Sequence, residues 1–445
     1  RQALEMRKRL LGEQHPDVAQ SLNALAALYQ NQGRYTQAEP LFRQALEMRK
    51  RLLGQQHPDV ATSLNDLAAL YQKQGRYSEA EPLHRQALEM TKRLLGEQHP
   101  SVATSLNNLA ALYGSQGRYT EAEPLYRQAL EMTKRLLGEQ HPSVASSLNN
   151  LALLYESQGR YSEAEPLYRQ ALEMTKRLLG EQHLLVATSL NNLAFLYWRQ
   201  AKITNALEIF GNGLQVDEQN LIYNLNAGFE RQKRDYLATI SGTIHATISL
   251  HLNSAPNNPT AARLALTTIL QRKGRILDIF TNSLQILRQR VNDTDSQKLI
   301  NELSDTYSQL ASLIYNRPEK LSVDQYRLQV VSLEETAKQL ESKLSARSAE
   351  FRSLSQPVRL EAIQKLIPAD GALVEIVRYK PFNPQASANQ SFGSLRYAVY
   401  ILKSQGEPQA IDLGDAKEIE PTLELFGNSL RLEFRLTHDK MTQQH

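Results

Sequence analysis

Cysteine is absent from all 445 residues of the chain. Its absence excludes disulfide bonds, thiolate metal sites and thiol nucleophiles within this sequence. The chain also lacks any run of about 18 apolar residues and any signal-peptide core at its N-terminus. A cytoplasmic location is therefore the default expectation.

Charge of one sign is scarce as well, since 51 Lys and Arg stand against 47 Asp and Glu, for a formal net charge of +4. The charges are evenly scattered, so neither a nucleic acid nor a membrane is an expected partner. No phosphate-binding loop, Gly-x-Ser-x-Gly elbow or His-Glu-x-x-His motif occurs. We therefore expect no cofactor, no bound metal, no catalytic residue and no small-molecule substrate.

What the first half does contain is a 42-residue unit that recurs almost letter for letter. Its clearest marker is a histidine at His15, His57, His99, His141 and His183. A unit of this length, written as two helices and a turn, cannot bury its apolar face alone, so neighbouring copies must stack into a solenoid with an extended concave surface. The first half is therefore predicted to hold another molecule.

Within one unit, the spacing of apolar residues predicts a first helix over Val18 to Gln32. Thr36 and Glu39 form a Ser/Thr-x-x-Glu pattern, which predicts a capping box at the start of the second helix. The same box is expected at Ser78/Glu81, Thr120/Glu123 and Ser162/Glu165. The second helix should end near Gly54, and His57-Pro58 should start the next first helix.

The periodic histidines could suggest a metal site, but they occur once per unit. Stacked units would hold them on the order of 10 Å apart, whereas ligands share a metal at about 2 Å. A role in starting helices is the better interpretation.

Several motifs recur in fixed order, and they resemble tetratricopeptide repeats, in particular the 42-residue kind of kinesin light chains. They are His-Pro-Asp-Val-Ala (57 to 61), Leu-Asn-Asn-Leu-Ala (106 to 110), Leu-Tyr (112 to 113), Gln-Gly-Arg-Tyr (116 to 119) and Glu-Ala-Glu-Pro-Leu-Tyr (121 to 126). The resemblance covers residues 1 to 216 and weakens at His183-Leu184. It implies a right-handed α-solenoid of helical hairpins, whose first helices line a concave groove for a protein or peptide segment.

One polar residue per unit turns away from the apolar stripe of the first helix. These residues form a ladder of amides at Asn23, Asn65, Asn107, Asn149 and Asn191. Amides both donate and accept, so the ladder could hydrogen-bond the backbone of an extended peptide. The alternative is that these amides are solvated or satisfied by neighbouring units.

Two less repetitive rows are expected to set specificity. The first row is Ala27, Ala69, Ala111, Leu153 and Phe195. The second row, one turn later, is Gln30, Gln72, Gly114, Glu156 and Trp198. The groove should become more apolar toward Phe195 and Trp198, which favours a ligand with a large apolar side chain at that end. Alternatively, both rings pack under the degenerate last unit.

The 42-residue period is lost after Leu221. Amphipathic patterns predict helices over Ala261 to Val291, Gln297 to Tyr315 and Val323 to Leu354. Runs rich in β-branched and aromatic residues then predict strands at 372 to 379, 395 to 402 and 409 to 413, followed by a helix over Lys417 to Leu430. This order predicts the opening of a partial α/β domain.

Residues 260 to 430 resemble the entry to a CHAT domain, the caspase-like module that follows tetratricopeptide repeats in many bacterial, especially cyanobacterial, proteins. The carrying segments are Arg272 to Asp278, the stretch from Leu340 to Phe351, and Leu366-Ile367-Pro368 leading into Leu373-Val374-Glu375 and Tyr379. Active members use a His/Cys dyad. No Cys is present, and His438 and His445 lie in a polar tail, so we expect no peptidase activity.

The sequence thus predicts a mainly α protein with a repeat solenoid over 1–216, a helical region over 217–365 and the start of a CHAT-like α/β domain over 366–445. Both ends look cut, because residue 1 lies inside the second helix of a unit. The preferred function is a non-enzymatic, protein-binding scaffold. The alternative is the recognition portion of a longer CHAT protease, and a true kinesin light chain is a weaker third interpretation.

Overall fold

The computed structural model describes residues 2–227, 241–281, 293–315, 321–347, 358–386 and 391–422. The chain divides into two compact units, one of residues 1–196 with 322–327 and one of residues 197–321 with 328–445. Among the described helices, none has both the length and the apolar character needed to cross a membrane.

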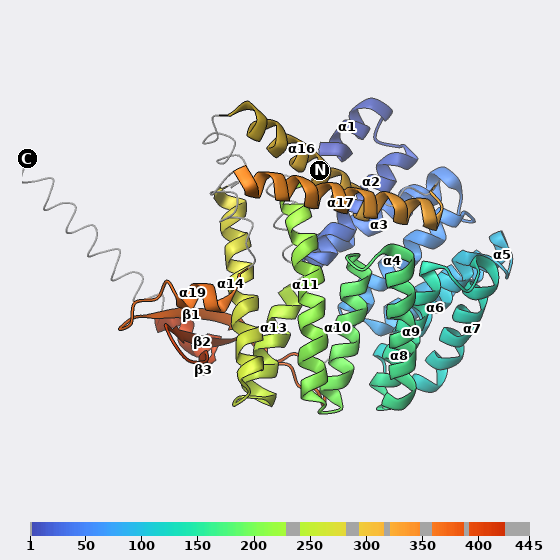
Figure 1. Cartoon of the computed structure of the whole chain (residues 1–445). Helices are drawn as coiled ribbons and strands as arrows, with labels where there is room; N and C mark the ends of the chain where they lie inside the picture. Colours follow the sequence, from blue (N-terminus) through green and yellow to red (C-terminus); the bar gives the residue numbers. More distant parts are fainter. Residues whose placement is uncertain are drawn as a thin grey trace, which may run out of the picture. The chain divides into compact units, whose positions relative to one another are not determined.

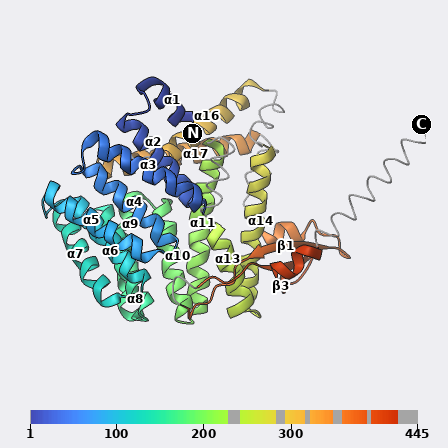
Figure 2. The ribbon, with the colours of Figure 1, turned by 180° about the vertical axis from the view of Figure 1, so that it is seen from behind.

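The first unit is an array of helical hairpins, which follow one another in chain order in Figure 1 and, from behind, in Figure 2. The helices are α1 (Gln2–Leu11), α2 (Pro16–Asn31), α3 (Tyr35–Leu53), α4 (Pro58–Lys73), α5 (Tyr77–Leu95), α6 (Pro100–Ser115), α7 (Tyr119–Leu137), α8 (Pro142–Ser157), α9 (Tyr161–Leu179) and α10 (Leu184–Arg199). The even-numbered ones are the first helices of the repeats. They contact each other directly (α2 with α4, α4 with α6, α6 with α8), which places them on the inner side of the stack.

The repeated histidines start the first helices, which confirms the role predicted for them. His57 is the N-cap of α4, and its Nδ1 accepts a hydrogen bond from the backbone N–H of Asp59 at 3.2 Å. Pro58 follows at the first helical position, where no N–H is needed. His15, His99, His141 and His183 accept the equivalent bond.

The predicted capping boxes are wrong. Helix α3 begins at Tyr35, its N-cap Arg34 makes no side-chain capping bond, and Thr36 already lies in the first turn. Glu39 instead accepts hydrogen bonds from the next repeat, from Arg76 Nη1 at 2.7 Å and from Tyr71 Oη at 3.1 Å. The same bonds recur one and two repeats later, at Glu81 and Glu123. Helices α5, α7 and α9 likewise start at Tyr77, Tyr119 and Tyr161 without a side-chain cap.

Glu81 shows how such a carboxylate joins two repeats. Partial burial alone would raise the pKa of Glu81, but hydrogen bonds from Arg118, Arg85 and Tyr113 outweigh it and lower the pKa. The guanidinium of Arg118 also lies 4.1 Å from the centre of the Tyr113 ring and pairs with Glu121 at 2.7 Å. One arginine therefore ties the carboxylate of one repeat to the aromatic ring and turn of the next.

His84 is a single departure from this regularity. The equivalent residues of the other repeats are Phe42, Tyr126 and Tyr168, whereas His84 is only 1% exposed and its Nδ1 lies 2.8 Å from Asn65 Oδ1. Burial lowers the pKa of His84 to about 4, so the folded array holds this imidazole neutral.

The second compact unit combines helices with a small sheet. The helices are α11 (Ile203–Ala227), α13 (Ser241–Ser249), the π-helix η1 (Leu250–Ser254), α14 (Pro259–Thr281), α16 (Thr294–Tyr315), α17 (Val323–Arg347) and α19 (Leu360–Gln364). The first residues of α17, 323–327, belong to the repeat unit. Parts of the predicted helices beyond 281, 347 and 422 lie outside the described residues.

The three predicted strands are present as β1 (Ala372–Tyr379), β2 (Arg396–Lys403) and β3 (Gln409–Asp415). They form an antiparallel sheet in the order β1-β2-β3. One face of this sheet, with Tyr379, Ala398, Tyr400 and Leu402, packs against Leu266 and its neighbours on α14 to form a buried core. A helical segment, residues 416–422, follows β3 directly.

We predict that His84 makes the stability of the array depend on pH. Because its folded pKa of about 4 lies below the ordinary value of 6.5, the unfolded chain binds the proton first as the pH falls. The neutral imidazole's contribution to the free energy of unfolding is fully present above about pH 6.5, and it decreases by about 3 kcal/mol as the pH falls toward 4. The control variant is His84→Tyr, because the next two repeats have tyrosine at this position. Urea unfolding between pH 7 and pH 4 should show a larger loss of stability in the wild type than in this variant. Equal pH dependence in both proteins would contradict the prediction.

We also predict that Glu81→Gln destabilises the array by about 1–3 kcal/mol, because it removes a charge that three donors share. The matched control is Glu89→Gln. Glu89 is an exposed residue of α5 that pairs only with Lys92 at 3.6 Å, and its loss should cost less than about 0.5 kcal/mol. Thermal unfolding of the two variants measures the difference, and equal losses would show that Glu81 has no special role.

Candidate functional site

The first helices leave one stripe of side chains outside the core. In α8 this stripe consists of Ser146, Asn150 and Leu153, spaced by four and three residues; Asn149 beside it is partly exposed, and the other positions between them are buried. Leu153 is the large apolar side chain of this stripe in α8, and it is 48% exposed. Because neighbouring first helices contact one another, their stripes lie side by side and form one continuous surface.

The predicted amide ladder lies at the seams between repeats. Asn65 Nδ2 donates to Ser105 Oγ of the next repeat at 3.3 Å, and Asn149 Nδ2 donates to Ser189 Oγ at 3.2 Å. Asn23 Nδ2 donates to Asp66 Oδ2 at 2.8 Å. These amides therefore hold neighbouring first helices together.

The carbonyl oxygens of the ladder are covered. Within the described residues, buried Oδ1 atoms without a hydrogen-bond partner occur at Asn23, Asn107, Asn149 and Asn191. At Asn65 the same oxygen faces His84, whereas the other repeats place Phe42, Tyr126 or Tyr168 at the position of His84. Contact between this ladder and a ligand stays a prediction.

A second amide row lies on the stripe, and the sequence reasoning missed it. Asn108, Asn150 and Asn192 each follow a ladder residue by one position and are partly exposed. The signal was present in the spacing, because Asn150 lies four residues after the exposed Ser146 and three before the exposed Leu153. The equivalent residue of α4 is Asp66, whose pKa burial raises although Asn23 donates to it.

The predicted specificity row from Gln30 to Trp198 is largely internal. Gln30 and Glu156 are 9% and 6% exposed, and Glu156 accepts a hydrogen bond from Tyr168 Oη at 2.8 Å. Gln72 is partly exposed, and its Nε2 donates to Ser115 Oγ of the next repeat at 2.8 Å. Gly114 offers no side chain.

Trp198 is 1% exposed and lies inside the second compact unit. Its Nε1 donates to Ser254 Oγ at 2.8 Å, and its ring centre lies 4.7 Å from that of Phe382 and 6.4 Å from that of Phe210. The alternative interpretation has both rings packing under the degenerate last unit, and the contact with Phe210 concerns Trp198 alone. Phe195, one turn earlier on α10, is partly exposed on the stripe.

Charge is nearly absent from the exposed stripe. Asp66 and Lys73 on α4 are its charged residues before α10, and Arg199 at the end of α10 donates to the backbone oxygens of Pro384 and Ala386 at 2.6 and 3.0 Å. The stretch formed by α6, α8 and the start of α10 therefore offers hydroxyls, amides and the apolar side chains Ala111, Leu153 and Phe195.

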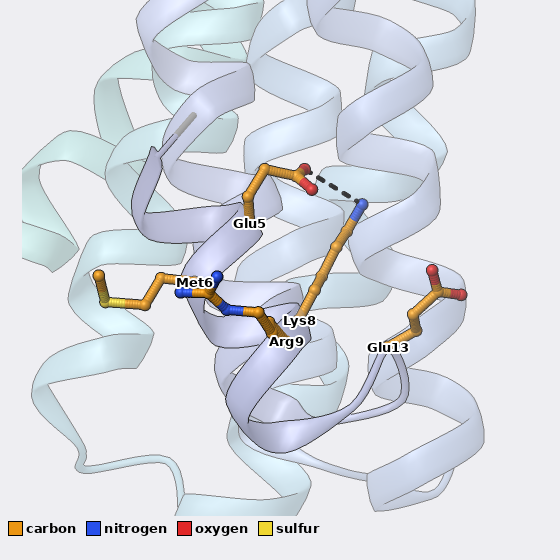
Figure 3. A pocket seen from close by; sticks show the side chains of 5 residues that line it. All are labelled: Glu5, Met6, Lys8, Arg9 and Glu13. Carbon is orange, nitrogen blue, oxygen red and sulfur yellow. Dashed lines mark ion pairs between the residues drawn. The ribbon is translucent and has the colours of Figure 1, made fainter.

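A surface hollow at α1 does not belong to this stripe. Figure 3 shows its lining of Glu5, Met6, Lys8, Arg9 and Glu13, with an ion pair of 3.6 Å between Glu5 and Lys8. All of these residues come from one second helix and the loop after it. Its lining is mostly long charged side chains around one methionine, and not the apolar walls with a few placed polar groups that are typical of a ligand site.

The sequence of the array matches a known repeat family. Residues 1–51, 17–93, 59–135, 101–177 and 143–219 each match the tetratricopeptide repeat family. Comparison with curated proteins finds no match.

Several solved structures are similar to the chain. BtubC (BKLC) from P. vanneervenii is 29% identical over 48% of this chain and 87% of that one, with a TM-score of 0.41. A putative kinesin light chain with nearly identical repeats from Podosopora anserina is 28% identical over 46% of this chain and 97% of that one, with a TM-score of 0.38. A Rap protein complexed with competence and sporulation factor is 12% identical over 74% of this chain and 75% of that one, with a TM-score of 0.42.

Proposed function

We propose, from the premise that residues 1–219 form tetratricopeptide repeats, that this array is a non-enzymatic protein-interaction module. Its ligand is an extended, uncharged protein segment that lies across the stripes of α6, α8 and α10 and places a large apolar side chain against Leu153. The observation that carries the proposal is the 48% exposure of Leu153 in a row that runs from Ala111 to Phe195. Covering such a side chain is favourable, so the row offers an apolar contact that a ligand can complete.

The second amide row supports backbone recognition. Neighbouring helices lie about 8–10 Å apart, and an extended chain rises about 3.3 Å per residue. Asn108, Asn150 and Asn192 are thus spaced to meet about every third residue of an extended ligand. Each amide donates and accepts, so it can pair with a peptide group whatever the side chain is.

The alternative function, recognition of substrate for a caspase-like CHAT protease, is supported by the strands at 372–415 and by the resemblance of the segments before them. A protease dyad cannot be assigned within this chain because it contains no Cys. The groove proposal does not depend on this alternative, since a recruiting groove serves a scaffold and a protease equally.

We predict that Leu153→Glu strongly weakens ligand capture. Short random peptides displayed on phage are selected against the full chain, and the enriched peptides should be uncharged around one large apolar residue. Losing the apolar contact should weaken their binding at least tenfold, because burying a leucine contributes about 1.5–3 kcal/mol. The control is Leu137→Glu, which changes a leucine of α7 that is 37% exposed and lies off the stripe. Equal binding by Leu153→Glu and the wild type would refute the groove.

We further predict that the two neighbouring amide rows have different roles, one in ligand binding and the other in the stability of the array. Asn150→Ala should weaken affinity for the selected peptide about fivefold and leave the urea midpoint unchanged, because about 1 kcal/mol of hydrogen bonding is lost only in the complex. Asn149→Ala should lower stability by a similar free energy and leave affinity unchanged, because Asn149 bonds Ser189. The reverse pattern would assign ligand contact to the originally predicted ladder.

A further inference from the structure

The start of helix α17 is held against the repeat array. Residues 322–327 belong to the same compact unit as the repeats. Within this segment Tyr326 is fully buried, and its ring meets the ring of His183 edge-on, with centres 6.4 Å apart and planes at 73°. His183 is the histidine that starts α10. An aromatic side chain from outside the repeats therefore lies beside one of the repeated histidines.

The segment presents this tyrosine from a well-defined helix start. Ser322 Oγ accepts a hydrogen bond from the backbone N–H of Gln325 at 3.2 Å, and Gln325 Oε1 accepts one from the backbone N–H of Ser322 at 3.1 Å. This reciprocal pair is a capping box, and Tyr326 follows it directly. Asp324 is the acidic residue of the same turn. The array thus holds a recognisable pattern, Ser-x-x-Gln-Tyr at the start of a helix.

His183 belongs to a corner that every repeat contains. We call a corner the Leu-Leu-Gly that ends a second helix together with the histidine that starts the next first helix. The corner beside Tyr326 runs from Leu178 to His183, and the corner between α3 and α4 runs from Leu52 to His57. The same letters also recur before His15, His99 and His141.

The corners have the same backbone shape. Gly180 has φ 93° and ψ 157°, and Gly54 has φ 85° and ψ 160°. The histidines of both corners accept the capping bond through Nδ1, at 3.1 and 3.2 Å, so their rings are held alike. The residue after the histidine differs, since Leu184 begins α10 where Pro58 begins α4. What is offered to an incoming side chain before that point is the same in both corners.

Exposure separates the two corners. Leu178 and Leu179, in the corner beside Tyr326, are only 7% and 3% exposed. In the corner between α3 and α4, Leu52 is 36% exposed and the imidazole of His57 is 38% exposed. The first corner is therefore closed, whereas the second is open and offers the same leucine and imidazole to solvent.

Charge suits the same occupant at both corners. The last turn of α9 carries Lys176 and Arg177, and the last turn of α3 carries Lys50 and Arg51. The first turn of α17 carries Asp324, so the segment at the closed corner brings an acidic residue to a basic helix end. A helix start of the same kind meets the same charges at the open corner.

We propose that the open corner from Leu52 to His57, with its equivalents, binds the start of a helix in another protein. This helix has a tyrosine directly after a Ser-x-x-Gln capping box and an acidic first turn. Its tyrosine lies beside His57 as Tyr326 lies beside His183. The chain's own segment 322–327 is not the expected occupant, because its tether holds it at its own corner at an effective concentration in the millimolar range. The corner is separate from the stripe of the first helices, so it adds a second kind of partner to the groove ligand.

Disulfide tethering in the full chain tests this contact, since an engineered thiol is the only one in a chain without cysteine. Gln55→Cys places a thiol at an exposed position inside the open corner. The probe is a synthetic peptide of residues 321–335 of this chain, preceded by Cys-Gly-Gly, and its matched peptide carries Tyr326→Ala. At equilibrium with a thiol reductant, the tyrosine peptide should label the chain about tenfold more than the alanine peptide, because it alone buries an aromatic ring.

Two variants show whether the preference comes from the corner. Thr36→Cys is the matched control, because this exposed residue of α3 lies about 25 Å from Leu53 at about 1.5 Å per residue. Both peptides should label it equally. Leu52→Glu in the Gln55→Cys chain should remove the preference for tyrosine, and circular dichroism of this variant should show unchanged helix content.

Four results would overturn the proposal. Equal labelling by the two peptides at Gln55→Cys would show that the corner does not recognise the tyrosine. The same preference at Thr36→Cys, or a preference that survives Leu52→Glu, would show that the tyrosine binds elsewhere. A full chain that is a dimer, and that Tyr326→Ala converts to a monomer, would assign the open corner to a second copy of the chain.

Discussion

The repeat array depends on polar bonds that cross from each repeat to the next. Glu81 is held by Arg118 and Tyr113 of the following repeat, and Asn65 bonds Ser105 across the same seam. A single repeat in isolation would expose the carboxylate and the amide to water and lose these bonds, which contribute about 0.5–1.5 kcal/mol each, or about 1.5–3 kcal/mol where a charged group takes part. The seams therefore make the stack, and not the hairpin, the unit of stability.

These seams explain why some positions of the first helix are constant along the array and others vary. Positions that bond the neighbouring repeat are nearly invariant along the array, as the row from Asn23 to Asn191 shows. The stripe beside them is free to vary, and it changes from Ala69 and Ala111 to Leu153 and Phe195. Regularity thus resides where repeats touch each other, and diversity resides where the protein meets solvent and, on our proposal, its ligand.

The sequence predicted the period, the helices and the three strands because each rests on local spacing of apolar residues. It failed where a partner is distant along the chain. The Thr36-x-x-Glu39 pattern obeys a local capping rule, yet Glu39 is taken by Arg76, 37 residues away. Trp198 is buried by Ser254 and Phe382, which no periodicity connects to it. The two amide rows are one residue apart along the chain, which is a rotation of about 100° around the helix. That rotation decides whether an amide faces the neighbouring repeat or the exposed stripe.

Seams built from the same residues in every repeat have a further consequence for how this protein can change length. Glu39, Glu81 and Glu123 each meet an identical arginine and tyrosine in the following repeat, so the repeats flanking a removed or duplicated copy still fit each other. A gain or loss of 42 residues would therefore preserve this Glu–Arg–Tyr junction and change the length of the inner surface by about one helix-pair width. Duplication or deletion of a whole repeat can therefore change the length of the protein without requiring a new kind of contact between repeats.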